Sequence, residues 1–229
     1  MSNLPTIILI ILGTILAYLF AKWLYKRIYT PLLIPVAGAT FLIIICLVIF
    51  NISYETYMIG GEWIHAFLGP AVVALAYPLY QNRRILKQLI VPLIGGTLVG
   101  SIVGISSGIY LSKLIGFSEE LIYSLTPKSV TTPVAMEISN SLGGIESLAV
   151  VFVMIAGITG AMISTYVFQR FQFTHFVGKG VGLGSASHAI GTAKALESGQ
   201  LEGSVSTVAM ILSAVFVSII APFIVTFFL

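Results

Sequence analysis

The chain has 229 residues, of which 58% are hydrophobic and only 8% are charged. Soluble domains carry about 25% charged residues, so this composition argues against a water-soluble globular protein and predicts a polytopic membrane protein. The formal net charge is only +3, and the basic residues gather near the ends of apolar runs, which argues against nucleic-acid binding. The single cysteine, Cys46, lies inside an apolar run and has no partner for an intramolecular disulfide.

Six apolar runs have roughly the length of about 20 residues that a membrane span needs. In chain order, they cover residues 4–21, 32–50, 63–80, 89–115, 145–168 and 203–228. No basic segment precedes the first run and no small-residue cleavage site follows it. We therefore expect a retained span there rather than a cleaved signal peptide.

Two further segments, residues 119–144 and 178–199, are too polar for a lipid-facing helix and too long for a simple surface connection. The expected fold is an all-α polytopic membrane protein with about six spans and two opposed re-entrant or broken-helix segments that form a weak inverted repeat. We expect a single integral membrane domain over residues 1–229. Its first four spans lie in 1–117, and the two broken segments, each followed by a span, lie in 118–229.

Basic residues follow the first, third and fifth runs, whereas the connections 51–62 and 116–120 carry glutamates without Lys or Arg. Because Lys and Arg mark cytoplasmic ends, every basic cluster lies inside only if residues 119–144 enter the membrane and return. This arrangement has six spans, two hairpins that enter from opposite faces, and both termini outside. In the alternative, each polar segment crosses fully as a broken helix, which gives eight crossings.

The two polar segments resemble each other weakly. A shift of 56 positions aligns five pairs of identical residues: Ser129 with Ser185, Gly143 with Gly199, Glu146 with Glu202, and Met154-Ile155 with Met210-Ile211. Both segments have a polar break, a short helix, a glycine, a glutamate and then a span. Non-helical backbone at membrane depth must be buried in protein or line a watery cavity, and paired broken segments point to a transporter's central binding site.

The fourth run carries four glycines spaced four residues apart, Gly96, Gly100, Gly104 and Gly108. On a helix these positions form one stripe, which lets another backbone approach closely. We expect the stripe to be a packing surface, either static or between parts that move.

In the first polar segment, Pro127 and Pro133 interrupt the helix, and Pro133 suits the first turn of a new one. Hydroxyls before that turn are expected to cap free N–H groups, and a helix N-terminus can receive a carboxylate. The candidate substrate-binding residues are Lys128, Ser129, Thr131, Thr132 and Asn140. Glu137 is a candidate for proton coupling or for pairing with Lys128 or Lys194, unless the helix surfaces early and leaves it solvated.

In the second polar segment, the candidate substrate-binding residues are Ser185, Ser187, His188, Thr192 and Lys194. The two serines are expected to cap a second short helix, and His188 lies one turn after Ser185, so that both can face one side. A histidine can titrate near neutral pH, which makes His188 a second candidate for proton coupling. The alternative is a neutral histidine bonded to a backbone carbonyl.

An enzymatic role finds little support. A Ser–His hydrolase needs a poised hydroxyl and imidazole with an oxyanion hole, and two residues three apart on one helix do not provide that geometry. The sequence has no phosphate loop and no Cys–His metal spacing. We therefore expect neither an enzyme nor a bound cofactor or metal.

The polar segments resemble the LrgB/CidB family of bacterial membrane proteins. The resemblance covers nearly the whole chain, and its most specific parts are KSVTTPVAMEIS, SLGGIESLAVVF and GLGSASHAIGTAKALE. It extends to ISYETYMIGGEWI and YPLYQNRR.

The resemblance implies a multi-pass protein of the bacterial plasma membrane, a homo-oligomer with a small LrgA/CidA-type partner. Family members are described as holin- or antiholin-like factors linked to murein hydrolase activity and cell lysis. Related proteins transport small carboxylates such as pyruvate, glycolate and glycerate. We predict monocarboxylate transport with proton coupling, because a simple pore does not need two opposed broken segments. The alternative function is a holin- or antiholin-like regulator of lysis.

Overall fold

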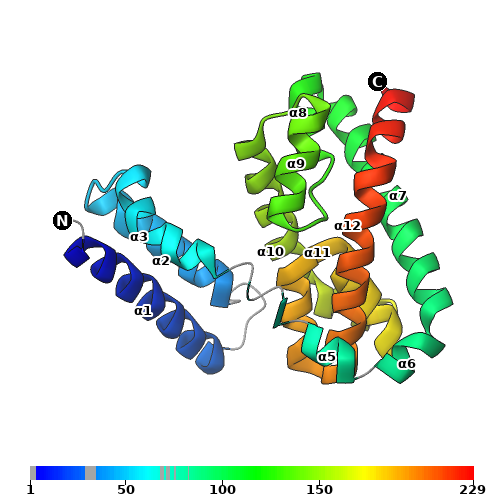
Figure 1. Ribbon diagram of the computed structural model, residues 1–229, viewed down its shortest axis with the longest axis horizontal. Helices are drawn as coiled ribbons and strands as arrows, with labels where there is room; N and C mark the ends of the chain where they lie inside the picture. The colour runs from blue at the N-terminus through cyan, green and yellow to red at the C-terminus, as the bar shows by residue number, and fades with distance from the viewer. Residues whose placement is uncertain (1–3, 29–34, 68–69, 71–72, 75, 82) are drawn as a thin grey trace. The chain divides into compact units, whose positions relative to one another are not determined.

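The computed structural model describes residues 4–28, 35–67, 70, 73–74, 76–81 and 83–229. It divides into two compact units, residues 1–76 and residues 77–229, which are considered separately here. In those described ranges, every regular element is a helix (Figure 1). The expectation of an all-α protein is therefore confirmed.

The first unit contains α1 (Leu4–Ile28), α2 (Pro35–Ile49) and α3 (Tyr54–Ala66), and α1 packs against both other helices. Gly60 lets α3 approach α1 closely, because a Cβ built there would lie 2.7 Å from the Ile10 Cβ. The Thr14 and Tyr57 hydroxyls lie 3.1 Å apart across the same contact. Ser53 begins α3 by accepting a hydrogen bond from the Thr56 N–H.

The second unit begins with two short helices, α5 (Ala76–Gln81) and α6 (Arg83–Gln88), and continues with the long α7 (Ile90–Ile115). The first broken segment forms α8 (Glu119–Leu125) and α9 (Thr132–Leu142), which precede the long α10 (Glu146–Arg170). The second forms α11 (Phe176–Ser198), which precedes the long α12 (Gln200–Phe228).

Within the described ranges, four helices are long and apolar enough to cross a membrane, namely α1, α7, α10 and α12. They match the first, fourth, fifth and sixth predicted spans, and they are the helices of a multi-pass membrane protein. The second predicted span forms only the 15-residue α2.

The third predicted span, residues 63–80, is wrong as a single helix. In the described residues, α3 already begins at Tyr54 and ends at Ala66, and α5 begins at Ala76. Pro70 explains the early end, because proline has no N–H and restricts the residue before it. Residues 68–69, 71–72 and 75 of the predicted span lie outside the described part.

Helices α7 and α12 run parallel to each other. Leu93 and Val205 share one apolar cluster near the start of both helices. The Ser101 and Ser213 hydroxyls lie 3.4 Å apart half-way along, and the Lys113 ammonium donates to the Phe228 carbonyl at the far end. Helix α10 packs against α8, α9 and α11.

A larger apolar cluster joins α7, α8, α9, α10 and α12, with Ile109, Ile122, Ala135, Val153 and Val217 among its buried members. Lipid tails are as apolar as these side chains, so close van der Waals packing holds such helices together in a bilayer. Small residues at the contacts make that packing possible, and they recur at each site described below.

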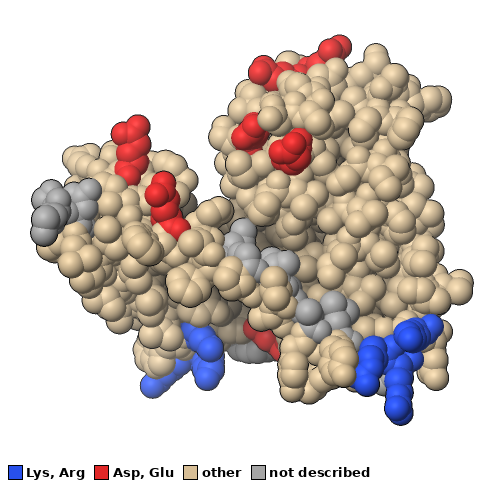
Figure 2. Space-filling view, viewed as in Figure 1, with Lys and Arg blue, Asp and Glu red and all other residues tan. Residues whose placement is uncertain are grey.

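The two ends of the second unit differ in charge, as Figure 2 shows. The basic end carries exposed Arg83, Arg84 and Lys87 before α7 and Arg170 at the end of α10. The acidic end carries exposed glutamates at the start of α8, on α9 and at the start of α10: Glu119, Glu120, Glu137 and Glu146.

Candidate functional site

Both broken segments reverse within the second unit. The first leaves α7 at the acidic end and returns there, where Ser124 of α8 accepts a hydrogen bond of 2.7 Å from the Ile145 N–H. The second leaves α10 at the basic end and turns back at His188. There Gly191 lies so close to the Leu183 carbonyl that an added Cβ would overlap it.

The turning points of both segments pack against the glycine stripe on α7. This stripe consists of Gly96, Gly100, Gly104 and Gly108. A Cβ built on Gly104 would lie 3.5 Å from the Ser129 Oγ, and one built on Gly100 would lie 3.2 Å from the Ser185 Oγ. The predicted role of the stripe as a packing surface is confirmed. Because four residues of helix rise about 6 Å, Ser129 and Ser185 meet neighbouring turns near the middle of α7.

The first turning point is held to α7 by a lysine. The Lys128 ammonium donates a hydrogen bond of 2.8 Å to the Gly104 carbonyl, and a Cβ on Gly108 would overlap it. Lys128 is only partly exposed. The structure thus brings a positive charge beside Ser129, at the point where the chain is not helical.

The predicted hydroxyl cap of α9 is wrong. Thr131 is the N-cap residue, with the expected extended backbone, but its side chain makes no capping hydrogen bond. An N-cap hydroxyl commonly bonds the N–H of the second or third helical residue. Pro133 occupies the second position and has no N–H, which leaves only the N–H of Val134, and Thr131 does not bond it. The first turn of α9 therefore begins without that side-chain cap.

The second turning point centres on His188. Its backbone has φ 42° and ψ −129° inside α11, a conformation that residues other than glycine rarely adopt. Its side chain is 3% exposed, and its Nε2 lies 3.0 Å from the Val153 carbonyl of α10. Since a carbonyl oxygen only accepts, Nε2 carries the proton in this contact. The geometry matches the alternative interpretation of a histidine bonded to a backbone carbonyl.

The serines of the second segment lie in the first half of α11. Ser185 donates to the Val181 carbonyl within its own helix and does not cap the second half. It points to Gly100 of α7, whereas His188 packs on Gly157 of α10, where an added Cβ would lie 2.6 Å from its Nε2. The expectation that Ser185 and His188 face the same side is therefore wrong. The backbone reversal at His188 separates their directions.

Ser187 and Thr192 complete the buried polar groups near this break. Ser187 is 1% exposed and lies against Gly160 of α10, where an added Cβ would overlap its hydroxyl. Thr192 is also 1% exposed, and its hydroxyl lies 3.0 Å from that of Ser206 on α12. Gly157 and Gly160 were not anticipated as site residues. Their spacing of three within an apolar run was the available signal.

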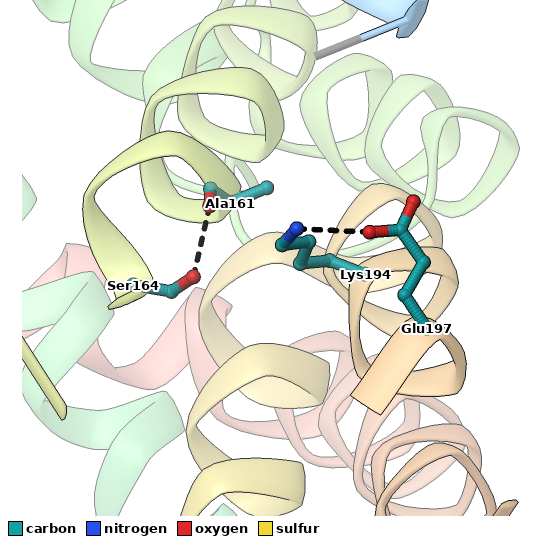
Figure 3. Close-up of polar contacts among 4 residues, drawn as sticks. All are labelled: Ala161, Ser164, Lys194 and Glu197. Atoms are coloured by element: carbon teal, nitrogen blue, oxygen red, sulfur yellow. Dashed lines mark hydrogen bonds and ion pairs between the residues drawn. The ribbon is translucent and has the colours of Figure 1, made fainter. Parts of the chain in front are cut away.

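Three predicted site residues lie away from the turning points. Glu137 and Asn140 are exposed on α9, and Glu137 lines a surface recess together with Ser141 and Ser218. Lys194 lies on the returning half of α11, where its ammonium is 2.8 Å from the Glu197 carboxylate (Figure 3). Glu137 is therefore not the partner of Lys194.

Lys194 instead lines a cavity of about 700 Å³ at the basic end, between α10, α11 and the start of α12. Its other polar lining includes Gln169, Lys179 and Glu202. Ser164 also lines it and donates to the Ala161 carbonyl of its own helix (Figure 3). Apart from Lys194, these residues were not predicted, although Glu202 had appeared in the internal repeat.

The family of the chain can now be stated. The profile of the LrgB-like family matches residues 14–227. The chain belongs to the LrgB-like family. It is 49% identical to the uncharacterized protein YxaC of Bacillus subtilis over 96% of both chains. It is 37% identical to the holin-like protein CidB of Staphylococcus aureus over the full length of both.

A second staphylococcal relative, the holin-like protein CidB of Staphylococcus epidermidis, is 36% identical over 96% of both chains. No solved structure matches the chain. The resemblance inferred from the polar segments is confirmed over nearly the whole length, and this family is not an enzyme family. Among the described residues, no group of three or more His, Cys, Asp or Glu side chains could hold a metal ion.

Proposed function

We propose that this LrgB-like membrane protein carries small monocarboxylate anions, of the size of pyruvate or glycolate, across the bacterial plasma membrane. The observation that carries the proposal is the approach of both turning points to neighbouring turns of one helix. Ser129 lies against Gly104, and Ser185 lies against Gly100. Two breaks at the middle of a span form the kind of arrangement from which transporters build a central site.

The proposed arrangement in the membrane is a single domain in which the broken segments are hairpins that enter from opposite faces as an inverted repeat. The reversal of each segment within the second unit supports this hairpin arrangement. The difference in charge between the basic and acidic ends of the unit also supports it, because basic residues mark the cytoplasmic side. Non-helical backbone at this depth is tolerated because α7 and α10 bury it.

The chemistry of the first turning point suits a carboxylate. The Lys128 ammonium supplies a positive charge, Ser129 a hydroxyl, and the start of α9 at Thr131 and Thr132 supplies N–H groups and the positive end of a helix dipole. Ser187 and Thr192 add hydroxyls from the second segment, while the Ser185 hydroxyl and the His188 Nε2 bond main-chain carbonyls beside them. Binding of a monocarboxylate needs a few hydrogen-bond donors and a positive charge. The lining of an uncharged pore needs neither.

A second candidate function is a holin-like regulator of murein hydrolase activity and lysis, acting with a small LrgA/CidA-type partner. The names of the staphylococcal relatives favour it over transport. The partly exposed Lys128 and the buried His188 at the breaks favour the carrier, because a pore formed by continuous helices has no use for them. The two functions predict different fluxes.

Reconstitution into proteoliposomes separates the two functions. A carrier takes up labelled pyruvate with saturable kinetics, and unlabelled glycolate competes, whereas an uncharged sugar of similar size does not enter. A pore releases solutes up to a size limit without saturation. Leakage of both solutes at equal rates would reject the carrier, and addition of the small partner protein tests whether either flux depends on it.

A further inference from the structure

The cavity at the basic end of the second unit has a charge arrangement that the proposed central site does not use. It measures about 700 Å³, and its polar lining includes Ser164 and Gln169 of α10, Gln172 in the turn after α10, Lys179 and Lys194 of α11, and Glu202 of α12. The reversal of α11 at His188 brings the two lysines, fifteen positions apart, to the same cavity. A cavity of this volume has room for a small carboxylate and several waters.

Glu202 is the unusual member of this lining. Its residue is only 8% exposed, and it is the one Lys, Arg, Asp or Glu among the described residues that is buried to this degree. A buried carboxylate is expensive unless a cation or hydrogen bonds compensate it. Lys179 lines the same cavity as Glu202, so its ammonium provides a counter-charge there.

The other charges around Glu202 can be assigned. Lys194, whose side chain is 15% exposed, pairs at 2.8 Å with Glu197, whose side chain is 52% exposed. The polar side chains that α10 and the turn after it contribute to the lining, including Gln169 and Gln172, are uncharged. Two ammonium groups and two carboxylates therefore balance each other when the cavity holds no ligand.

An entering carboxylate upsets this balance. It adds one negative charge to a partly enclosed site where both lysines already have a carboxylate nearby. A proton on Glu202 removes that excess, and it also releases Lys179 to bind the anion. The exposed Glu137 lacks this property, because water solvates its charge whether or not an anion is bound.

We propose that this cavity binds a small carboxylate anion together with a proton. Lys179 and Lys194 hold the anion, and Glu202 takes the proton from solution, with no bond made or broken in the ligand. The choice of a monocarboxylate rests on the proposed function. The site is separate from the two turning points, and it lies at the end of the unit that faces the cytoplasm in the proposed arrangement.

The test is proton uptake on binding. Pyruvate is added to the full-length protein in detergent with little buffer, and an indicator dye counts the protons taken up between pH 6 and 9. The wild type should take up about one proton per pyruvate at the pH where Glu202 is ionised, and its affinity should fall as the pH rises. Glu202→Gln should bind pyruvate with no proton uptake and with an affinity that stays constant with pH.

Matched variants make the result decisive. Glu146→Gln should keep the proton uptake, because that carboxylate is exposed at the acidic end, away from the cavity. Lys179→Gln should weaken pyruvate binding at least five-fold, whereas Lys113→Gln, at the acidic end, should leave it unchanged. Those lysine variants test the site even if Glu202→Gln does not fold.

Several results would overturn the proposal. One is a wild type that binds no pyruvate, or that binds it without taking up protons. Another is proton uptake that survives in Glu202→Gln and disappears in His188→Gln, and a third is equal affinity in Lys179→Gln and Lys113→Gln. Binding with proton uptake in a protein that shows no saturable flux would reject the carrier function while leaving this site intact.

Discussion

His188 combines a strained backbone with a buried hydrogen bond. The conformation at φ 42° and ψ −129° belongs to a region that costs roughly 1–3 kcal/mol for a residue with a Cβ. A single hydrogen bond such as that from Nε2 to the Val153 carbonyl contributes about 1 kcal/mol. The hydrogen bond therefore contributes no more free energy than the strained backbone costs. Stability alone does not explain why a histidine occupies this position. Strain of this kind clusters at functional sites.

Two substitutions at His188 separate the backbone from the imidazole. Both His188→Gly and His188→Ala lose the bond to Val153, but only the glycine variant relieves the strain. We expect His188→Gly to unfold in detergent at a higher temperature than His188→Ala, by a difference of roughly 1–3 kcal/mol in unfolding free energy. Pyruvate uptake should be lost in both variants. Wild-type uptake by His188→Gly would mean that the imidazole has no role in transport.

Lys128 is the second residue whose position calls for a function. Its ammonium bonds a main-chain carbonyl of α7 beside the first turning point, so it serves either to hold the segment or to bind an anion. Lys128→Gln keeps a donor for the Gly104 carbonyl but removes the charge. We expect it to raise the pyruvate concentration for half-maximal uptake at least ten-fold, about 1.4 kcal/mol, with little change in thermal stability. A loss of stability with unchanged half-saturation would assign Lys128 to packing alone.

At the scale of elements, glycines decide how closely α11 approaches α12. A Cβ on Gly184 would overlap the Ser206 carbonyl and lie 2.9 Å from the Ala209 Cβ. Neither group can move without shifting the α12 backbone. Gly182, two residues earlier, has only the Phe168 ring nearby, at 3.7 Å from a built Cβ. The two positions therefore form a matched pair on one helix.

We expect Gly184→Ala to destabilise the protein by about 1–3 kcal/mol, the usual range for overpacking. Gly182→Ala should be neutral or stabilise it by up to about 1 kcal/mol, since alanine is the better helix former. Thermal unfolding in detergent, followed by the loss of monodisperse protein, measures both. Equal stabilities would show that α11 and α12 can separate at Gly184 without cost.

The elements also show which features a sequence can reveal. Long apolar runs predicted α1, α7, α10 and α12, because length and hydropathy alone define such helices. The four-residue spacing of glycines predicted the packing surface on α7. The third span failed because its apolar run covers residues 63–80, whereas α3 already ends at Ala66.

The local details of the site were harder to predict. At Thr131, Pro133 removes one of the two N–H groups that an N-cap hydroxyl can bond, but only if α9 begins at Thr132. Helix boundaries read from sequence are uncertain by one or two residues. The different directions of Ser185 and His188 depend on a single backbone reversal. The cavity around Glu202 is lined by residues of three helices, and no local sequence pattern predicts such a site.

At the scale of the whole molecule, the family match over residues 14–227 includes both compact units, whereas every predicted site residue belongs to the second. The second unit alone contains two broken segments, three long helices and a charge difference between its ends. The binding of an anion is therefore argued from this unit. Its direction in the membrane is open to a direct test.

The six-span and eight-crossing arrangements differ in where the bases of the two segments lie. We expect Ser118→Cys and Ser141→Cys, which flank the first segment, to react with an impermeant maleimide from outside the cell, in a chain whose Cys46 is replaced by serine. Thr174→Cys and Ser198→Cys, which flank the second, should react only after the membrane is opened. All four positions are exposed. If each segment crossed fully, the members of each pair would label from opposite sides, because a full crossing moves the chain from one face to the other. Labelling of Ser118→Cys and Ser141→Cys from opposite faces would therefore reject the re-entrant hairpin, and with it the meeting of the two breaks at the middle of the membrane.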